Sequence, residues 1–353
     1  MTTDTAPTGP APAPGPARRW VLGARPRTLP AAVVPVLVGT AAAHPWSHHV
    51  SRVVITFSHG ATGSQTTIDF RPPAGLGVNA WWCALGALIV ALAIQVGTNY
   101  ANDYSDGIRG TDDARVGPVR LVATGLASPA AVKRAALIAF GVAGVVGLGL
   151  AWATSWWVLV VGAACLAAGW FYTGGPRPYG YAGLGEAFVF VFFGLVATVG
   201  TFYVQTLRVG EPVVWAAAVG VGLLATALLL ANNLRDIATD AVSGKKTLAV
   251  RIGRKTADLC YVACVGLPFV GVVVWTALSV TGSVESARPA IALLPLLALP
   301  LTVAPIRLVR SEASGRALLP VLAATGRLQL VFGVLLSVAL WLWIPLYLPR
   351  GFG

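Results

Sequence analysis

The chain has 353 residues, of which 56% are hydrophobic and only 11% are charged, and its mean hydropathy is +0.74. So few charged residues exclude a soluble globular protein of this size. The net charge of +12 fits anionic lipid or an anionic substrate better than nucleic acid. The composition predicts an all-α protein that crosses a membrane many times, because helices of about 20 apolar residues satisfy their own backbone in lipid.

Apolar segments of that length recur along the chain after a tail, residues 1–19, whose Pro-rich and Gly-rich start predicts disorder on the cytoplasmic side. They are residues 22–43, 80–101, 132–153, 155–173, 184–206, 213–234, 257–281, 289–306 and 326–347. We therefore expect about nine transmembrane helices in one membrane domain, residues 20–347, followed by a short tail at 348–353.

The first long loop, residues 44–79, holds all four histidines. Its segments Val53–Phe57 and Thr66–Phe70 flank a Gly-containing turn, which predicts a β-hairpin. The histidines are irregularly spaced, so we interpret the loop as a solvated insertion on the outer side rather than as a metal site.

The distribution of positive charge predicts the orientation of the chain. With the N-terminus inside, 20 of the 25 Lys and Arg residues fall on the inner side of the nine segments, as the positive-inside rule requires. The remaining five, Arg52, Arg71, Arg208, Arg288 and Arg350, fall outside.

Two clusters of acid and amide side chains close the second and sixth apolar segments. The first contains Asn99, Asn102, Asp103 and Asp106, and the second contains Asn232, Asn233, Asp236 and Asp240. Residues three, four and seven apart share one helix face, so each cluster predicts one wall of a shared, pseudo-symmetric site. The first cluster has Gly110 where the second has Asp240, and nearby Asp112 or Asp113 could supply the missing carboxylate.

The chemistry of these clusters indicates a magnesium and diphosphate site. Ionisable groups beside a bilayer are costly and usually functional, although Asn and Asp also cap helices and Lys and Arg also anchor spans. Carboxylate and amide oxygens are suitable ligands for Mg²⁺, and oxygens of a substrate phosphate can complete its coordination shell. Basic residues that could bind the phosphates follow both clusters: Arg115, Arg120, Arg177, Arg235, Lys245 and Lys246.

Several motifs, in order, resemble the UbiA superfamily of membrane aromatic prenyltransferases. The segments are residues 24–30, 99–113, 117–120, 172–186, 232–236 and 244–251. The resemblance is nearest to the branch that prenylates 1,4-dihydroxy-2-naphthoate in menaquinone synthesis. Gly110 fits that branch, whereas loop 44–79 is longer than the usual connection.

The resemblance implies a Mg²⁺-dependent transfer of a polyprenyl group from its diphosphate to 1,4-dihydroxy-2-naphthoate, with loss of CO₂. The implied metal residues are Asn102, Asp106, Asp236 and Asp240, with Asp112 and Asp103 as further candidates. The implied diphosphate contacts are Arg115, Arg120, Arg177, Arg235 and Lys245. Arg25 or Arg27 would bind the aromatic carboxylate, and Tyr172, Tyr179 or Tyr181 would shield an allylic cation.

The sequence also predicts a setting in a bacterial cell membrane, with the N-terminus and active site facing the cytoplasm, no obligate protein partner, and a cavity open to lipid. Three alternatives remain. A sister enzyme would use another acceptor, such as 4-hydroxybenzoate. A transporter would place acids at mid-helix, and a purely structural scaffold gives no reason for two acid clusters.

Overall fold

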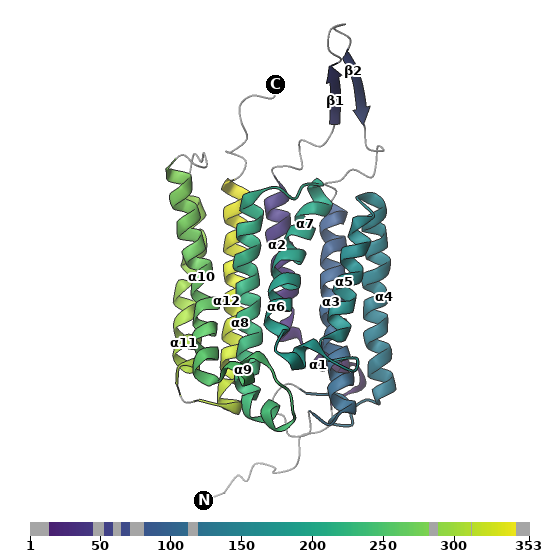
Figure 1. Cartoon of the computed structure of the whole chain (residues 1–353), viewed down its shortest axis with the longest axis vertical. Coiled ribbons are helices and arrows are strands. Elements are labelled where there is room, and N and C mark those ends of the chain that lie inside the picture. The colour runs from purple at the N-terminus through teal and green to yellow at the C-terminus, as the bar shows by residue number, and fades with distance from the viewer. Residues whose placement is uncertain are drawn as a thin grey trace, which may run out of the picture.

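A computed structural model describes residues 14–44, 53–58, 65–70, 81–111, 119–281, 289–311 and 313–343. The β-strands β1 (Val53–Ser58) and β2 (Gln65–Phe70) are antiparallel and pair Val53 with Phe70. They occupy the two segments that the sequence assigns to a hairpin. All other elements are helical and form one bundle (Figure 1).

The helical elements follow one another in chain order. The α-helices are α1 (Pro16–Ala24), α2 (Pro30–Ala43), α3 (Trp81–Ile108), α4 (Pro129–Ala153), α5 (Trp157–Phe171), α6 (Gly185–Val189), α7 (Ala197–Thr206), α8 (Pro212–Val242), α9 (Leu248–Ile252), α10 (Arg254–Val280), α11 (Val303–Val309) and α12 (Leu319–Trp343). The 3₁₀ segments are η1 (Pro26–Thr28), η3 (Tyr179–Ala182), η5 (Pro289–Thr302) and η6 (Gly315–Leu318), and η4 (Phe190–Val196) is a π-helix.

The bundle confirms an all-helical membrane fold. In the described part of the chain, seven helical segments are long and apolar enough to cross a membrane. The segments Pro16–Thr28 and Pro30–Ala43 together form an eighth candidate, bent by 55°, and α5 is a shorter apolar helix. The exact number of nine crossings stays a prediction.

Helices α3 and α8 extend well past the ends of the apolar segments that the sequence defines. The predicted ends are residues 101 and 234, whereas the helices end at Ile108 and Val242. The additional turns carry Asn102, Asp103 and Asp106 of the first cluster and Asp236 and Asp240 of the second, and all five residues are buried in the bundle. Polarity marks the edge of lipid, but it does not end a helix when neighbouring elements bury the polar turns.

Small residues allow the helices to pack closely, as is usual in membranes. Gly194 of η4 lies against Gly222 of α8, and a Cβ added at Gly194 would lie 2.4 Å from the Cα of Gly222. Gly333 of α12 packs equally tightly on Val34 of α2. Helix α8 contributes to both of the larger buried clusters, packing with α2 and α7 in one and with α10 and α12 in the other.

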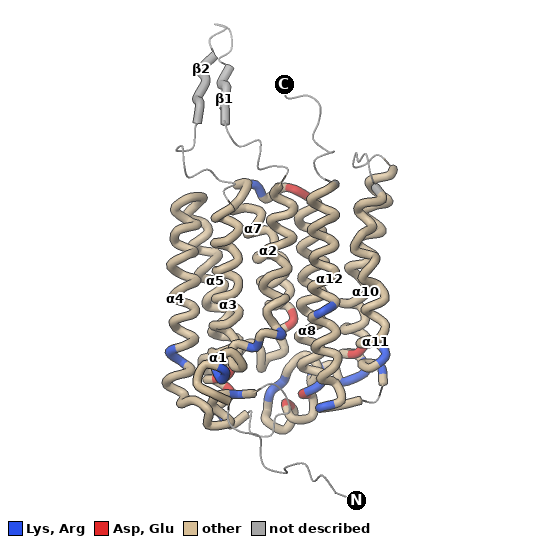
Figure 2. Tube along the Cα trace, turned by 180° about the vertical axis from the view of Figure 1, so that it is seen from behind, with Lys and Arg blue, Asp and Glu red and all other residues tan. Residues whose placement is uncertain are grey.

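Charged side chains gather at one end of the bundle, where α1 and α11 lie (Figure 2). Arg208 and Glu211 lie in the connection between α7 and α8 and form an ion pair of 3.2 Å. Because α3 and α8 both finish at the charged end, their acid clusters meet the majority of the basic residues there.

Candidate active site

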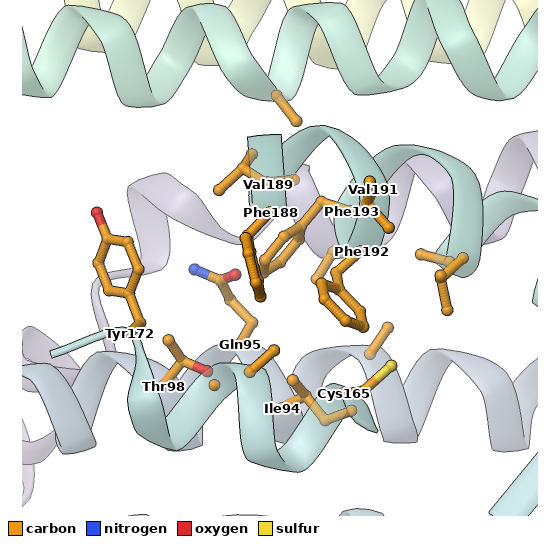
Figure 3. A pocket seen from close by; sticks show the side chains of 18 of the residues that line it. Ile94, Gln95, Thr98, Cys165, Tyr172, Phe188, Val189, Val191, Phe192 and Phe193 are labelled. Carbon is orange, nitrogen blue, oxygen red and sulfur yellow. The ribbon is translucent and has the colours of Figure 1, made fainter. Parts of the chain in front are cut away.

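A cavity of about 880 Å³ runs along the bundle between α3, α5, η4 and α8. At the charged end its wall contains Asn102, Asp106, Arg120, Asp240 and Lys245. Further along, the wall is almost entirely apolar. Figure 3 shows Phe188 and Phe192 on one side of this part, opposite Ile94 of α3 and Cys165 of α5. The cavity therefore joins a small charged pocket to a long hydrophobic channel.

Asp106 is the centre of the charged pocket. Its Oδ1 accepts a hydrogen bond of 2.6 Å from the Tyr181 hydroxyl. Its Oδ2 lies 3.2 Å from Lys245 Nζ and 3.7 Å from Arg120 Nη2. Asp106, Arg120 and Lys245 are all buried, so these charges are weakly screened. Burial, together with the Asp106 carboxylate, raises the pKa of Tyr181 above its ordinary value, so the phenol is a neutral donor.

Lys245 reaches the pocket through a tight turn after α8. Gly244 has a positive φ of 77°, which a glycine adopts without strain. The Lys245 N–H then donates to the carbonyl of Asp240 at 2.9 Å, and the Lys246 N–H donates to the carbonyl of Tyr181 at 3.0 Å. The Lys245 ammonium lies 4.9 Å from the centroid of the Tyr181 ring. The turn at Gly244 thus directs the Lys245 side chain toward Asp106.

The two acid clusters meet in this cavity, but not all of their members face it. Asn102 accepts a hydrogen bond of 2.8 Å from Thr173 Oγ1 and lines the cavity, as Asp240 does. Asp236 is not on the wall, because both of its oxygens accept from the adjacent Arg235, at 2.7 and 2.6 Å. Arg235 itself lines the cavity, and its Nη1 is buried without a hydrogen-bond partner.

A second polar group is built where the first membrane segment bends. Arg25 has a left-handed backbone, with φ of 53°, which is uncommon for a residue other than glycine. Its guanidinium lines the cavity, and Nε and Nη2 are buried without partners. Thr28 Oγ1 nearby donates to the Arg25 carbonyl and accepts from Gln95 at 2.9 Å and from Asn99 at 3.1 Å. This end of the wall therefore presents an unsatisfied cation held by a fixed scaffold.

Aromatic rings lead from the charged pocket into the apolar channel. The Tyr172 and Tyr179 rings meet edge to face at 5.5 Å, and Tyr179 stacks on Phe188 at 4.0 Å. Tyr179 also donates its hydroxyl to the Ala168 carbonyl at 2.8 Å, and burial raises its pKa. All three predicted tyrosines, Tyr172, Tyr179 and Tyr181, line the cavity.

Several predicted site residues lie elsewhere. Arg177 and Arg27 are exposed and are not part of the cavity wall. Asp103 is buried, but its carboxylate accepts hydrogen bonds from the backbone of Leu121 and Val122. Asp112 and Arg115 lie outside the described residues.

Other wall residues were not predicted as site residues from the sequence. Thr28 and Thr173 lie within motif segments but are uncharged and have no metal-ligand spacing, and Gln95 is a single polar residue in an apolar segment, so no pattern marks them as site residues. Asn233 belongs to the second cluster, whereas its partner Glu186 is a lone acid at the start of an apolar segment. The structure joins them through a bond of 2.8 Å from Asn233 Nδ2 to Glu186 Oε1.

The residues of the charged pocket fit a magnesium ion that is shared with a phosphate ligand. Among the described residues, no three His, Cys, Asp or Glu side chains form a metal centre by themselves. Asp106, Asp240 and Asn102 nevertheless bring hard oxygens from two helices to one cavity. Mg²⁺ is commonly bound by one or two carboxylates with substrate phosphates and water completing the shell, so this donor set is adequate.

Comparisons with known proteins agree with this geometry. Residues 74–274 match the UbiA prenyltransferase family. The 1,4-dihydroxy-2-naphthoate octaprenyltransferase of Mycobacterium tuberculosis is 45% identical over 322 residues, which cover 91% of this chain and 96% of the relative. The Escherichia coli protein of the same name is 34% identical over 330 residues, with coverage of 92% and 95%.

Solved structures share the fold at low sequence identity. A UbiA homolog from Archaeoglobus fulgidus, bound to DMAPP and Mg²⁺, superimposes with a TM-score of 0.56 at 15% identity, covering 91% of this chain and 98% of that one. The apo UbiA homolog from Aeropyrum pernix K1 gives a TM-score of 0.57 at 13% identity, covering 87% and 96%.

Proposed function

Since the chain belongs to the UbiA prenyltransferase family, we propose that it transfers a polyprenyl group from its diphosphate to 1,4-dihydroxy-2-naphthoate. The acceptor loses CO₂ and the product is demethylmenaquinone. The observation that carries the proposal is one cavity that joins a pocket of acids and bases to an apolar channel. Relatives named for this activity support the choice of acceptor.

We assign Mg²⁺ binding to Asn102, Asp106, Asp236 and Asp240, with Asp112 as a further candidate. Asp236 is held by Arg235 in the structure and keeps its place in the set because of its motif. Bound Mg²⁺ would neutralise charge on the diphosphate and make it a better leaving group. The solved structure with DMAPP and Mg²⁺ supports the choice of metal.

The basic residues of the pocket bind and orient the diphosphate. Lys245 and Arg120 already lie beside Asp106, and Arg235 has a buried N–H without a partner. These donors compensate for negative charge as the bond between the prenyl carbon and the diphosphate oxygen breaks. Arg115, near the same pocket in sequence, is a further candidate, whereas exposed Arg177 is better suited to guiding the diphosphate toward the mouth.

The acceptor binds with its carboxylate toward Arg25, whose buried N–H groups have no partner. Arg27 is exposed, so we favour Arg25 for this contact. The ring carbon that carries the carboxylate attacks the prenyl carbon as the bond from that prenyl carbon to the diphosphate oxygen breaks. The bond from the ring to its carboxyl group then breaks, returns its electron pair to the ring and releases CO₂. Tyr172 and Tyr179 place π-faces along the path of the cationic prenyl carbon.

The protein is a multi-pass membrane protein. We propose that it lies in a bacterial cell membrane with its charged end, and hence the diphosphate pocket, on the cytoplasmic side. The observation behind this orientation is the gathering of Lys and Arg at that end (Figure 2).

Acceptor choice is tested with purified protein, a polyprenyl diphosphate and Mg²⁺, supplied with either 1,4-dihydroxy-2-naphthoate or 4-hydroxybenzoate. We expect prenylated product with the naphthoate only, and Arg25→Ala should raise its KM at least tenfold, since a charge-assisted contact is lost. Arg27→Ala, at an exposed position, is the control. Product with 4-hydroxybenzoate alone would replace the acceptor, and flux into vesicles without product would favour a transporter.

A further inference from the structure

Asp103 is completely buried at 0% exposure, and it is not part of the cavity wall. Its Oδ2 accepts the N–H of Leu121 at 2.8 Å, and its Oδ1 accepts the N–H of Val122 at 3.1 Å. A carboxylate that receives two backbone N–H groups is a strong local clamp. Both of its oxygens are therefore used to hold a loop that lies 18 residues further along the chain.

The loop held by Asp103 begins directly after Arg120, which faces the charged pocket. The Arg120 guanidinium is buried, lines the cavity and lies 3.7 Å from Asp106. The Arg120 carbonyl accepts the backbone N–H of Thr124 at 3.0 Å and also accepts the Thr124 hydroxyl. The backbone is thus fixed on the C-terminal side of Arg120, immediately beside the side chain that faces the pocket.

Close packing fixes the same loop from two sides. A Cβ added at Gly107 of α3 would lie 2.5 Å from the Cβ of Val122. A Cβ added at Gly23 of α1 would lie 2.6 Å from Leu121 Cδ1. The contact at Gly107 is with the Cβ of Val122, so a larger residue there would have to move the loop, and helix α3 sets the position of residues 121 and 122 through both Asp103 and Gly107.

We propose that Asp103 is a positioning residue, which fixes the loop after Arg120 and so directs the Arg120 guanidinium at the diphosphate, and that it is not a metal ligand. This inference rests on the proposed function of the pocket. Within the first acid cluster, Asp106 faces the ligand, whereas Asp103 holds the backbone that positions the Arg120 guanidinium.

The test measures binding of geranylgeranyl diphosphate to purified protein in the absence of acceptor, as a function of Mg²⁺. Asn at position 103 keeps the size but offers an NH₂ group to one of the two backbone N–H donors. We expect Asp103→Asn to raise the Kd about tenfold, while the Mg²⁺ concentration for half-maximal binding stays unchanged. Asp106→Asn, which alters the pocket itself, should change the Mg²⁺ requirement.

A double-mutant cycle shows whether Asp103 acts through Arg120. In an Arg120→Ala background, Asp103→Asn should weaken binding no further. Gly107→Ala displaces Val122 but leaves the Asp103 carboxylate unchanged, so it should reproduce the higher Kd. This variant replaces Asp103→Asn in the test if the Asp103→Asn protein does not fold. Equal losses in both backgrounds, or a shifted Mg²⁺ requirement in Asp103→Asn, would overturn the inference. Failure of the unaltered protein to bind the diphosphate would instead refute the proposed function.

Discussion

At the scale of single residues, Asp106 is the point where the charged pocket is organised. One oxygen is held by the Tyr181 hydroxyl at 2.6 Å, and the other lies between Lys245 and Arg120. Two buried cations, Lys245 and Arg120, therefore hold this oxygen in place. The pocket therefore offers a carboxylate to a metal ion and two cations to the negative charge of the ligand that carries it.

Tyr181→Phe removes the hydrogen bond to Asp106 but keeps the ring. We expect kcat/KM for the prenyl diphosphate to fall about tenfold, because a hydrogen bond to a charged group is lost. Tyr179→Phe is the matched control, since its hydroxyl donates to the Ala168 carbonyl and not to Asp106 among the described residues, and it should retain most of its activity. Equal losses in the two variants would show that the contact with Asp106 has no special role.

The raised pKa of Tyr181 gives an expectation for the pH profile. Burial and the Asp106 charge both favour the neutral phenol, so its proton is retained to a higher pH than that of an ordinary tyrosine, whose pKa is about 10. The profiles of the unaltered protein and of Tyr181→Phe should therefore run parallel between pH 7 and about pH 9.5. An alkaline loss of activity present only in the unaltered protein would contradict this.

Sequence patterns predict the ligand-facing residues better than they predict the supporting ones. Asn102, Asp106 and Asp240 were expected on one site, and they line one cavity. Asp103 follows Asn102 directly, and periodicity alone cannot show that a distant loop lies behind it. The unpartnered guanidinium atoms of Arg25 likewise depend on a bend that composition does not reveal.

At the scale of elements, the close contact between η4 and α8 fixes the position of η4, which forms part of the cavity wall. A Cβ at Gly222 would lie 2.9 Å from Phe190 Cδ2 and 3.0 Å from the Phe190 carbonyl oxygen. Gly222→Ala should therefore push η4 away and cost about 1–3 kcal/mol, which a thermal-unfolding assay in detergent would detect.

Gly220→Ala, two residues earlier on α8, is the control for that prediction. A Cβ there would lie 3.7 Å or more from its neighbours, so the substitution should leave the thermal midpoint unchanged. Similar midpoints for the Gly220→Ala and Gly222→Ala proteins would mean that the close approach of η4 to α8 does not contribute to stability.

The sequence predicts most helices but not their irregularities. Apolar length was sufficient to locate every long helix, because lipid forces such segments to be helical. The π-helix of η4 and the break between α1 and α2 arise from packing and from local turns. Both irregularities lie on the cavity wall, where π-helical turns and strained residues are often found in functional sites.

At the scale of the whole molecule, we expect the channel to open toward the lipid. Trp157 and Val161 of α5 and Val191 of η4 line the cavity, and they are 73%, 46% and 39% exposed. A polyprenyl tail can therefore enter from the bilayer between α5 and η4 while its diphosphate reaches the charged end.

Gly162→Phe tests this channel. Gly162 lines the cavity, and a Cβ added there meets nothing within 4 Å, so the ring can project into the channel. We expect activity with long polyprenyl diphosphates to fall much more than activity with dimethylallyl diphosphate. Gly144→Phe on α4, an exposed position with equal space, is the control. A uniform loss for short and long substrates would contradict a tail channel at this place.

The most direct test of the central claim is product formation by the purified protein from 1,4-dihydroxy-2-naphthoate and a polyprenyl diphosphate, with and without Mg²⁺, beside Asp106→Asn and Asp236→Asn. We predict Mg²⁺-dependent demethylmenaquinone together with equal amounts of CO₂ and diphosphate, and no product from either variant. Product that forms without any divalent metal, or full activity in both variants, would contradict the account.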